Sequence, residues 1–115
     1  MSPAQHDRQI DYIEFPCADL LATKRFYTEV FGWKFTDYGP EYTSFEDGRL
    51  SGGFAQADGP GIGPLVVIYS EDLDATRRRV EAAGVKTFKE HSFPGGRRFH
   101  FKDPGGNELA VWSEK

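Results

Sequence analysis

The sequence predicts an α+β fold in which two tandem βαβββ modules form curved sheets around a cavity. Two observations predict it. Hydrophobic periodicity indicates the same order of elements twice along the chain, namely one strand, one helix and three strands. The two helices begin after Asp19 and Asp72, about half a chain length apart, and each ends at a glycine. Because a helix covers only one face of its own four strands, the uncovered faces of both modules can line one cavity.

The first module is expected over residues 10–56. Its first strand, 10–15, is rich in β-branched and aromatic residues and ends at Pro16. A helix follows between a typical N-cap, Asp19, and a typical stop, Gly32. The apolar stripe of this helix is expected to contain Leu20, Thr23, Phe26, Tyr27 and Val30. Three more strands, separated by Gly-Pro and Asp-Gly turns, are expected at 33–38, 42–46 and 50–56.

The second module is expected over residues 65–115, after a joint rich in glycine and proline at 57–64. It begins with the apolar strand 65–69, and its helix lies between Asp72 and Gly84. The stripe of this helix consists of Leu73, Thr76, Val80 and Ala83. Three strands are then expected at 85–89, 97–102 and 108–112. Residues 1–9 are polar and are expected to form a flexible tail, which leaves 10–115 as a single domain.

Composition excludes several classes of function. With 115 residues, 38% of them hydrophobic, the chain has enough apolar material for one core. Its 14 Lys and Arg against 18 Asp and Glu argue against a general nucleic-acid binder, which needs a surplus of cations. The apolar runs are far shorter than the ~20 residues that cross a bilayer, and the polar N-terminus lacks the core of a signal peptide. We therefore expect a cytoplasmic protein with no nucleic-acid or membrane partner.

Short motifs occur in a characteristic order in both halves. The first half contains Ile10-Asp11-Tyr12-Ile13-Glu14, Asp19-Leu20, Phe26-Tyr27 and Phe31-Gly32-Trp33. The second half contains Asp72-Leu73-Asp74, Ala83-Gly84-Val85 and Asp103-Pro104-Gly105-Gly106-Asn107. In these motifs the chain, from about residue 10 to 112, resembles the vicinal-oxygen-chelate superfamily of glyoxalases, bleomycin-resistance proteins and extradiol dioxygenases. The resemblance implies the doubled βαβββ fold and a protein that pairs, so we expect a homodimer.

The resemblance also implies where a metal would bind. Members that hold one take His, Gln or Glu ligands from the first and last strands of each half, which leaves positions open for two substrate oxygens. The matching positions here carry Tyr12 in the first strand and Ala110 in the last. The second half begins with Leu65 or Val66, and the first half ends with Gln56. One tyrosine does not make a metal site, so no metal of the family type and no cofactor is expected.

Strand alternation indicates which side chains face the cavity. Five residues are candidates for ligand contact: Tyr12, Glu14, Arg98, His100 and Trp112. The same alternation turns Glu108 toward the cavity. Aromatic walls with a few directed polar groups suit a planar or amphipathic organic molecule. Each residue also has a structural interpretation: Tyr12 and Trp112 as wall residues, Glu14 as a rim carboxylate paired with a cation, and His100 as a strand histidine bonded to a neighbour.

The sequence leaves three functions open. The preferred one is a metal-free protein that holds a small aromatic or hydrophobic molecule, as bleomycin-resistance members do. The second is a glyoxalase-like lyase, isomerase or dioxygenase-type enzyme that works through Glu14, His100 or Tyr12, or with a metal recruited in an unusual way. No catalytic residue is assigned. The third is a structural or regulatory role, in which the chain pairs with another copy or another protein.

Overall fold

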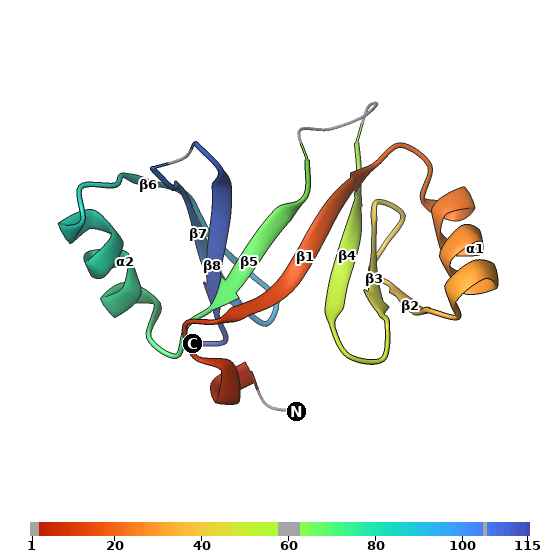
Figure 1. Cartoon of the computed structure of the whole chain (residues 1–115), viewed down its shortest axis with the longest axis horizontal. Coiled ribbons are helices and arrows are strands. Elements are labelled where there is room, and N and C mark those ends of the chain that lie inside the picture. Colours follow the sequence, from red (N-terminus) through yellow and green to blue (C-terminus); the bar gives the residue numbers. More distant parts are fainter. Residues whose placement is uncertain (1–2, 58–62, 105) are drawn as a thin grey trace. The chain divides into compact units, whose positions relative to one another are not determined.

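The computed structural model describes residues 3–57, 63–104 and 106–115. Within these residues two α-helices, eight strands and a short 3-10 helix, η1, are present (Figure 1). In chain order they are η1 (Pro3–His6), β1 (Ile10–Cys17), α1 (Leu20–Phe31), β2 (Lys34–Asp37), β3 (Tyr42–Glu46), β4 (Ser51–Gln56), β5 (Leu65–Tyr69), α2 (Leu73–Ala82), β6 (Thr87–Phe93), β7 (Gly96–Lys102) and β8 (Glu108–Ser113). The predicted α+β class and the doubled βαβββ order are confirmed.

The two modules pair their strands in the same way. In the first, β1 is parallel to β4, and β3 is antiparallel to both β4 and β2. In the second, β5 is parallel to β8, and β7 is antiparallel to both β8 and β6. Each helix lies on one side of the strands of its own module (Figure 1). The chain divides into two compact units: Tyr12–Leu65 forms one, and Val66–Lys115 together with the segment up to Asp11 forms the other.

The first helix begins and ends where the sequence predicts. The carboxylate of Asp19 accepts a hydrogen bond from the backbone amide of Ala22 at 3.0 Å, which satisfies one of the free amides of the first turn. The helix is followed by Gly32 at φ 72°, a left-handed conformation that glycine adopts without steric cost. These two local signals therefore fix α1 independently of its packing.

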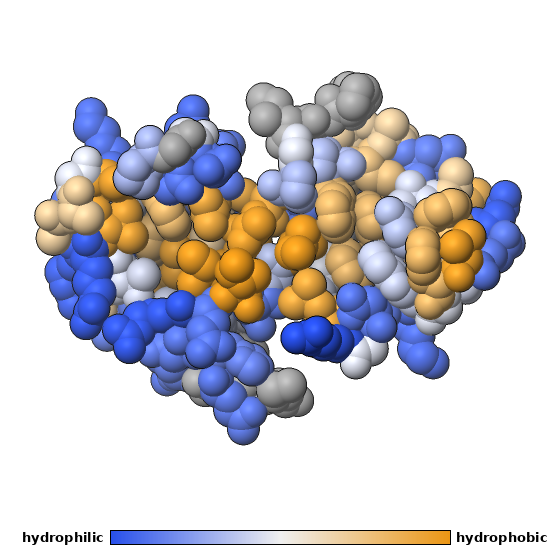
Figure 2. Space-filling model, in the orientation of Figure 1, coloured by the Kyte–Doolittle hydropathy of each residue, from blue (hydrophilic) through white to orange (hydrophobic). Residues whose placement is uncertain are grey.

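The predicted stripe of α1 is wrong at two positions. Leu20 and Tyr27 pack against the core of the first module, as expected. Phe26 and Val30, however, are 51% and 57% exposed. The line of the helix that faces the core runs through Leu20 and Tyr27, two turns apart, and the other two side chains lie to one side of that line. Hydrophobic residues consequently remain on the surface over α1 (Figure 2).

Aromatic rings form the core of the first module. Phe45 of β3 and Phe54 of β4 are buried there with Cys17 of β1. Trp33 stacks on Phe45 with ring centroids 4.6 Å apart, and Tyr27 of α1 stacks on the other side of Trp33 at 4.4 Å. Such stacked pairs add to the hydrophobic gain of burying the rings. They place α1 firmly on one face of β1, β4 and β3.

The second module has a smaller, mainly aliphatic core under α2. Asp72 caps this helix by accepting a hydrogen bond from the amide of Ala75 at 3.0 Å. Leu73 of α2, Phe99 of β7 and Val111 of β8 are 1%, 0% and 1% exposed and pack together. The side chain of Phe99 is thus enclosed between the helix and the sheet, and it holds the two layers of this module together.

Strand β6 differs from the sequence prediction. A strand was expected at 85–89, but β6 extends from Thr87 to Phe93. The pairing of β6 with β7 shifts register between Phe88 and His91, and Lys89 has φ 54° inside this β-bulge. A bulge breaks the two-residue alternation that identifies a strand, which explains why the sequence pattern ended too early.

The segment expected as a tail carries η1 and is bonded to the second module. The amide of Arg8 donates to the carbonyl of Tyr69 at 2.7 Å, and the carboxylate of Asp7 accepts from the amide of Glu71 at 2.8 Å. Positions 1–2 of this segment, 58–62 of the expected joint and 105 of the Asp103–Asn107 turn lie outside the described residues. Among the residues described, neither helix combines the length and apolar character needed to cross a membrane.

Candidate functional site

The five candidate residues lie on the strand faces that the helices leave uncovered. In the first module, Phe15 and Cys17 of β1 pack toward α1, so alternation turns Tyr12 and Glu14 the other way. In the second, Phe99 and Val111 pack toward α2. Alternation then turns the remaining three, Arg98, His100 and Trp112, away from α2. The candidates thus form two groups: Tyr12 and Glu14 in the first module, and the other three in the second. That both groups line one cavity stays a prediction.

Tyr42 of β3, which sequence reasoning missed, joins Tyr12 to Glu14. Its hydroxyl lies 2.5 Å from that of Tyr12 and donates to Oε2 of Glu14 at 2.9 Å. Burial, reinforced by the hydrogen bond with Tyr12, raises the pKa of Tyr42 well above its ordinary value, so this phenol stays protonated. The two hydroxyls meet over Gly53, where a Cβ atom would collide with both. Alternation with the buried Phe45 was the signal that could have placed Tyr42 here.

Trp112 is held in a fixed orientation in the second module. Its indole Nε1 donates to Oδ2 of Asp11 at 3.0 Å. Its ring meets that of Tyr69 edge-on, with centroids 5.2 Å apart, and lies 6.4 Å from that of Phe93. Arg98 is its register partner on β7. A tethered indole next to other rings offers a rigid apolar surface, which is a common wall for an organic ligand.

His100 forms a polar pair with Glu108, supported by Lys89. The histidine is 4% exposed, and its Nδ1 lies 2.8 Å from Oε2 of Glu108. Lys89 donates to the same carboxylate oxygen at 3.1 Å. Burial lowers the pKa of His100 below its ordinary value and outweighs the opposite effect of Glu108. The hydrogen bonds from His100 and Lys89 keep the pKa of Glu108 below its usual range. At neutral pH the ring is therefore neutral and the carboxylate charged.

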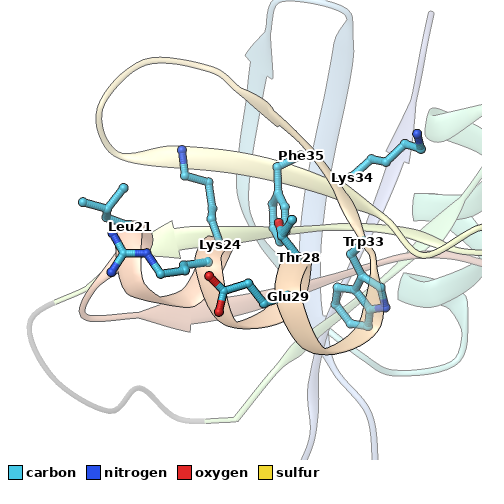
Figure 3. Close-up of a pocket in the computed structure, with 8 residues that line it drawn as sticks. Leu21, Lys24, Thr28, Glu29, Trp33, Lys34 and Phe35 are labelled. Atoms are coloured by element: carbon cyan, nitrogen blue, oxygen red, sulfur yellow. The ribbon is translucent and has the colours of Figure 1, made fainter.

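Two hollows occur in the described surface of the compact unit Tyr12–Leu65. The larger, about 570 Å³, is an open groove on the outer side of α1 and β2, bordered by Leu21, Trp33 and Phe35 (Figure 3). Its charged groups are surface lysines, arginine and glutamate, and Lys24 is already paired with Asp37 at 2.9 Å. The smaller hollow, about 210 Å³, is lined by Glu14 and Gln56 together with apolar residues such as Pro16 and Leu65. Of the five candidates, only Glu14 borders either hollow.

A comparison with models of known protein families shows which family the chain belongs to. The model of the Glyoxalase/Bleomycin resistance protein/Dioxygenase superfamily matches residues 9–111, nearly the whole chain. The chain belongs to this superfamily. The match covers both modules, as the resemblance in the short motifs had indicated.

Several proteins of known structure or role are similar to this glyoxalase-superfamily chain. The anthracycline biosynthesis protein DnrV of Streptomyces peucetius is 34% identical over 117 positions, covering 82% of this chain and 42% of DnrV. The Mn(II)-bound glyoxalase from Novosphingobium aromaticivorans is 27% identical with a TM-score of 0.71, covering 95% of this chain and 40% of that one. Methylmalonyl-CoA epimerase from Mycobacterium tuberculosis has the same fold, at 17% identity and a TM-score of 0.72, covering 90% and 86%. The chain thus spans less than half the length of the first two relatives.

The donor set of this chain does not fit a metal of the family type. The matching positions in the second module carry Leu65 or Val66 in the first strand and Ala110 in the last, and none of these side chains can bind a cation. Gln56, at the end of β4, borders the smaller hollow with Glu14, but its side-chain amide donates to the carbonyl of Ala18 at 2.8 Å. Among residues 3–57, 63–104 and 106–115, no three His, Cys, Asp or Glu side chains are grouped as metal ligands.

The bulge at Lys89 supplies a direct stability test. Lys89→Gly is expected to be more stable than Lys89→Ala by about 1 kcal/mol, because glycine adopts φ 54° without strain. Both variants lose the same ion pair with Glu108, in which the lysine side chain is 60% exposed, so this loss cancels in the comparison. Urea denaturation of the two variants measures the difference. Equal stability would mean that residue 89 does not hold the left-handed conformation in solution.

Proposed function

We propose that this chain is a small-molecule-binding protein that holds an aromatic or hydrophobic organic ligand on the helix-free faces of its strands without a metal ion. The proposed contacts are Tyr12, Glu14, Arg98, His100 and Trp112. The observation that carries the proposal is the arrangement of two side chains on the helix-free face of the second module. Trp112, whose indole is bonded to Asp11, lies two residues along β8 from Ala110. Ala110 is the register partner of His100, which is buried and bonded to Glu108. An apolar surface next to a few directed polar groups is typical of sites for small organic ligands.

Two further observations support this proposal. Members of the superfamily bind small ligands, and DnrV is named for a role in anthracycline biosynthesis, a small-molecule pathway. Of the positions that match the ligands of metal-binding members, one carries Tyr12, whose hydroxyl is bonded to another tyrosine, two carry aliphatic side chains, and the fourth carries Gln56, whose amide is bonded to the carbonyl of Ala18. Such side chains favour contact with an organic molecule over chelation of a cation.

The two tryptophans of the chain allow a specific binding test. In a Trp33→Phe variant, Trp112 is the only source of tryptophan fluorescence. Titration with a panel of one-ring and two-ring aromatic compounds is expected to change this emission in a saturable way, before and after treatment with a metal chelator. The matched Trp112→Phe variant leaves Trp33 in the core of the first module and is expected to respond weakly. Saturable binding that is abolished by the chelator would contradict the metal-free part, and no response to any compound would contradict the proposal.

We also propose that the protein is a cytoplasmic homodimer. Two copies of this chain would be needed to approach the length of DnrV or of the Mn(II)-bound glyoxalase, of which one copy covers 42% and 40%. Native mass spectrometry is expected to give twice the chain mass of 13.0 kDa, and to show whether a small molecule is carried along. A monomer at micromolar concentration would contradict this part.

A second candidate function is a glyoxalase-like lyase, isomerase or dioxygenase-type enzyme. The observation that favours it is the His100–Glu108 pair, because a histidine oriented by a carboxylate can move protons. Metal analysis of the purified chain distinguishes the two functions. Stoichiometric manganese, iron, nickel or zinc would favour the enzyme, whereas tight ligand binding without such a metal favours the binding protein.

A further inference from the structure

The two ring nitrogens of His100 differ in their hydrogen bonding. Nδ1 is bonded to Glu108, whereas Nε2 is buried and has no hydrogen-bond partner among the residues that the structure describes. A buried polar atom without a partner costs about 1–3 kcal/mol, so native proteins seldom leave one unused. Nε2 of His100 is therefore a candidate contact for a bound molecule.

The contacts of Glu108 determine which hydrogen bond Nε2 can make. A carboxylate only accepts hydrogen bonds, so the hydrogen of the neutral ring must lie on Nδ1. Lys89 donates to the same oxygen and stabilises the charged form of Glu108. Nε2 is then a hydrogen-bond acceptor, and what it lacks is a donor. Glu108 acts here as a positioning residue for the ring, and Lys89 in turn holds the Glu108 carboxylate through a hydrogen bond.

The surroundings of Nε2 narrow the kind of donor. The ring of Phe88 lies 6.0 Å from that of His100, centroid to centroid, and Trp112 shares the same strand face. The charged groups nearby, Arg98 and Lys89, disfavour a cationic donor. A neutral hydroxyl on an aromatic ring satisfies both the acceptor and the aromatic surroundings, whereas a plain hydrocarbon would leave Nε2 unpaired.

We propose that Nε2 of His100 accepts a hydrogen bond from a hydroxyl group of the ligand, so that the preferred ligands are phenols. This inference rests on the proposed binding function and adds the ligand class and the role of Glu108. A phenol donates to Nε2 while its ring lies among the aromatic side chains. A methyl ether of the same phenol cannot donate and leaves the nitrogen unpaired.

The test compares 2-naphthol with its methyl ether, 2-methoxynaphthalene, by calorimetry on the full chain at pH 7.5. The naphthol is expected to bind about tenfold more tightly, the value of one hydrogen bond to a buried acceptor. In a His100→Phe variant, which keeps an aromatic ring but has no acceptor, this preference is expected to disappear. Equal binding of both compounds to the natural chain overturns the inference and leaves the proposed function standing. Binding of neither compound overturns the inference, and the proposed function then stands or falls with the wider panel of aromatic compounds.

Variants of Glu108 test its positioning role. Glu108→Gln keeps an oxygen that accepts the Nδ1 hydrogen and is expected to retain the preference for naphthol. Glu108→Leu removes that acceptor, so the hydrogen can move to Nε2 and the preference is lost. Nitrogen-15 spectra of the histidine rings check this without ligand. They are expected to show Nδ1–H for His100 in the natural chain and Nε2–H in Glu108→Leu. An Nε2–H signal in the natural chain overturns the inference.

The preference should also depend on pH in a defined direction. Protonation of His100 places a hydrogen on Nε2 and abolishes the acceptor. The pKa of His100 lies below its ordinary value of about 6.5, because burial and the nearby Arg98 and Lys89 outweigh Glu108, while the ring of His91 lies 6.4 Å away. The preference for naphthol should therefore be complete at pH 7.5 and should be lost only as the pH falls through the lowered pKa of His100. A preference that persists when His100 is fully protonated overturns the inference.

Discussion

Replacement of Phe99 by alanine is expected to destabilise the second module by about 3–5 kcal/mol. The side chain is fully buried between α2 and the sheet, in contact with the cluster of Leu73 and Val111, so its removal leaves a cavity that neither layer can close. Because the free energy of unfolding of small domains is only about 5–15 kcal/mol, the substitution would remove a large part of it. Urea denaturation followed by circular dichroism measures the loss.

The control for this prediction is the same substitution at an exposed site. Phe26 of α1 is 51% exposed, and its replacement by alanine removes less buried area while alanine favours the helix. Phe26→Ala is therefore expected to cost about 1 kcal/mol or less. If the two variants lost equal stability, Phe99 would not be the central packing residue of its module.

Gly52→Ala is expected to cost about 3 kcal/mol, at the upper end of the range for overpacked cores. A Cβ atom at this position would collide with the backbone carbonyl of Ile13 and with the ring of Phe45. The carbonyl belongs to β1, which is paired with β4 at this point, and Phe45 is 3% exposed in an aromatic core. Neither obstacle can move without breaking strand pairing or stacked rings. Thermal unfolding measures the effect.

Gly39→Ala separates this collision from the general cost of replacing a glycine. A Cβ atom at Gly39 meets no other atom within 4 Å, and the cost arises only from its φ of 84°. That strain is about 1 kcal/mol. A loss at Gly39 equal to that at Gly52 would mean that the close approach of β4 to β1 and Phe45 contributes nothing.

Local signals allowed much of the fold to be predicted from the sequence. The ends of α1 depend on Asp19 and Gly32, whose effects act within one turn and need no knowledge of packing. The face of each strand depends on alternation, which correctly placed Arg98 and His100 opposite the buried Phe99. These are properties of neighbouring residues, so a single sequence carries them.

Other features depend on contacts between distant residues, and a single sequence does not show them. The outward position of Phe26 and Val30 follows from how far α1 rotates on its aromatic core. The bond from Lys89 to Glu108 requires the β-bulge in β6, which no short pattern announced. The hydrogen bond between Tyr12 and Tyr42 joins residues 30 positions apart and requires the absence of a side chain at Gly53.

The parallel pairing of the first and last strands has a consequence for how the chain reaches its native state. Val66 of β5 pairs with Leu109 of β8, and the intervening helix and hairpin must be made before these two strands can meet. On the ribosome, β5 therefore emerges with the backbone N–H and C=O groups of the edge that meets β8 unpaired until β8 follows. Contacts so far apart along the chain slow folding, because the entropy of closing the loop is lost before pairing compensates for it. Antiparallel β6 and β7, joined by a tight turn, can assemble early and serve as the template on which β8 and finally β5 are added.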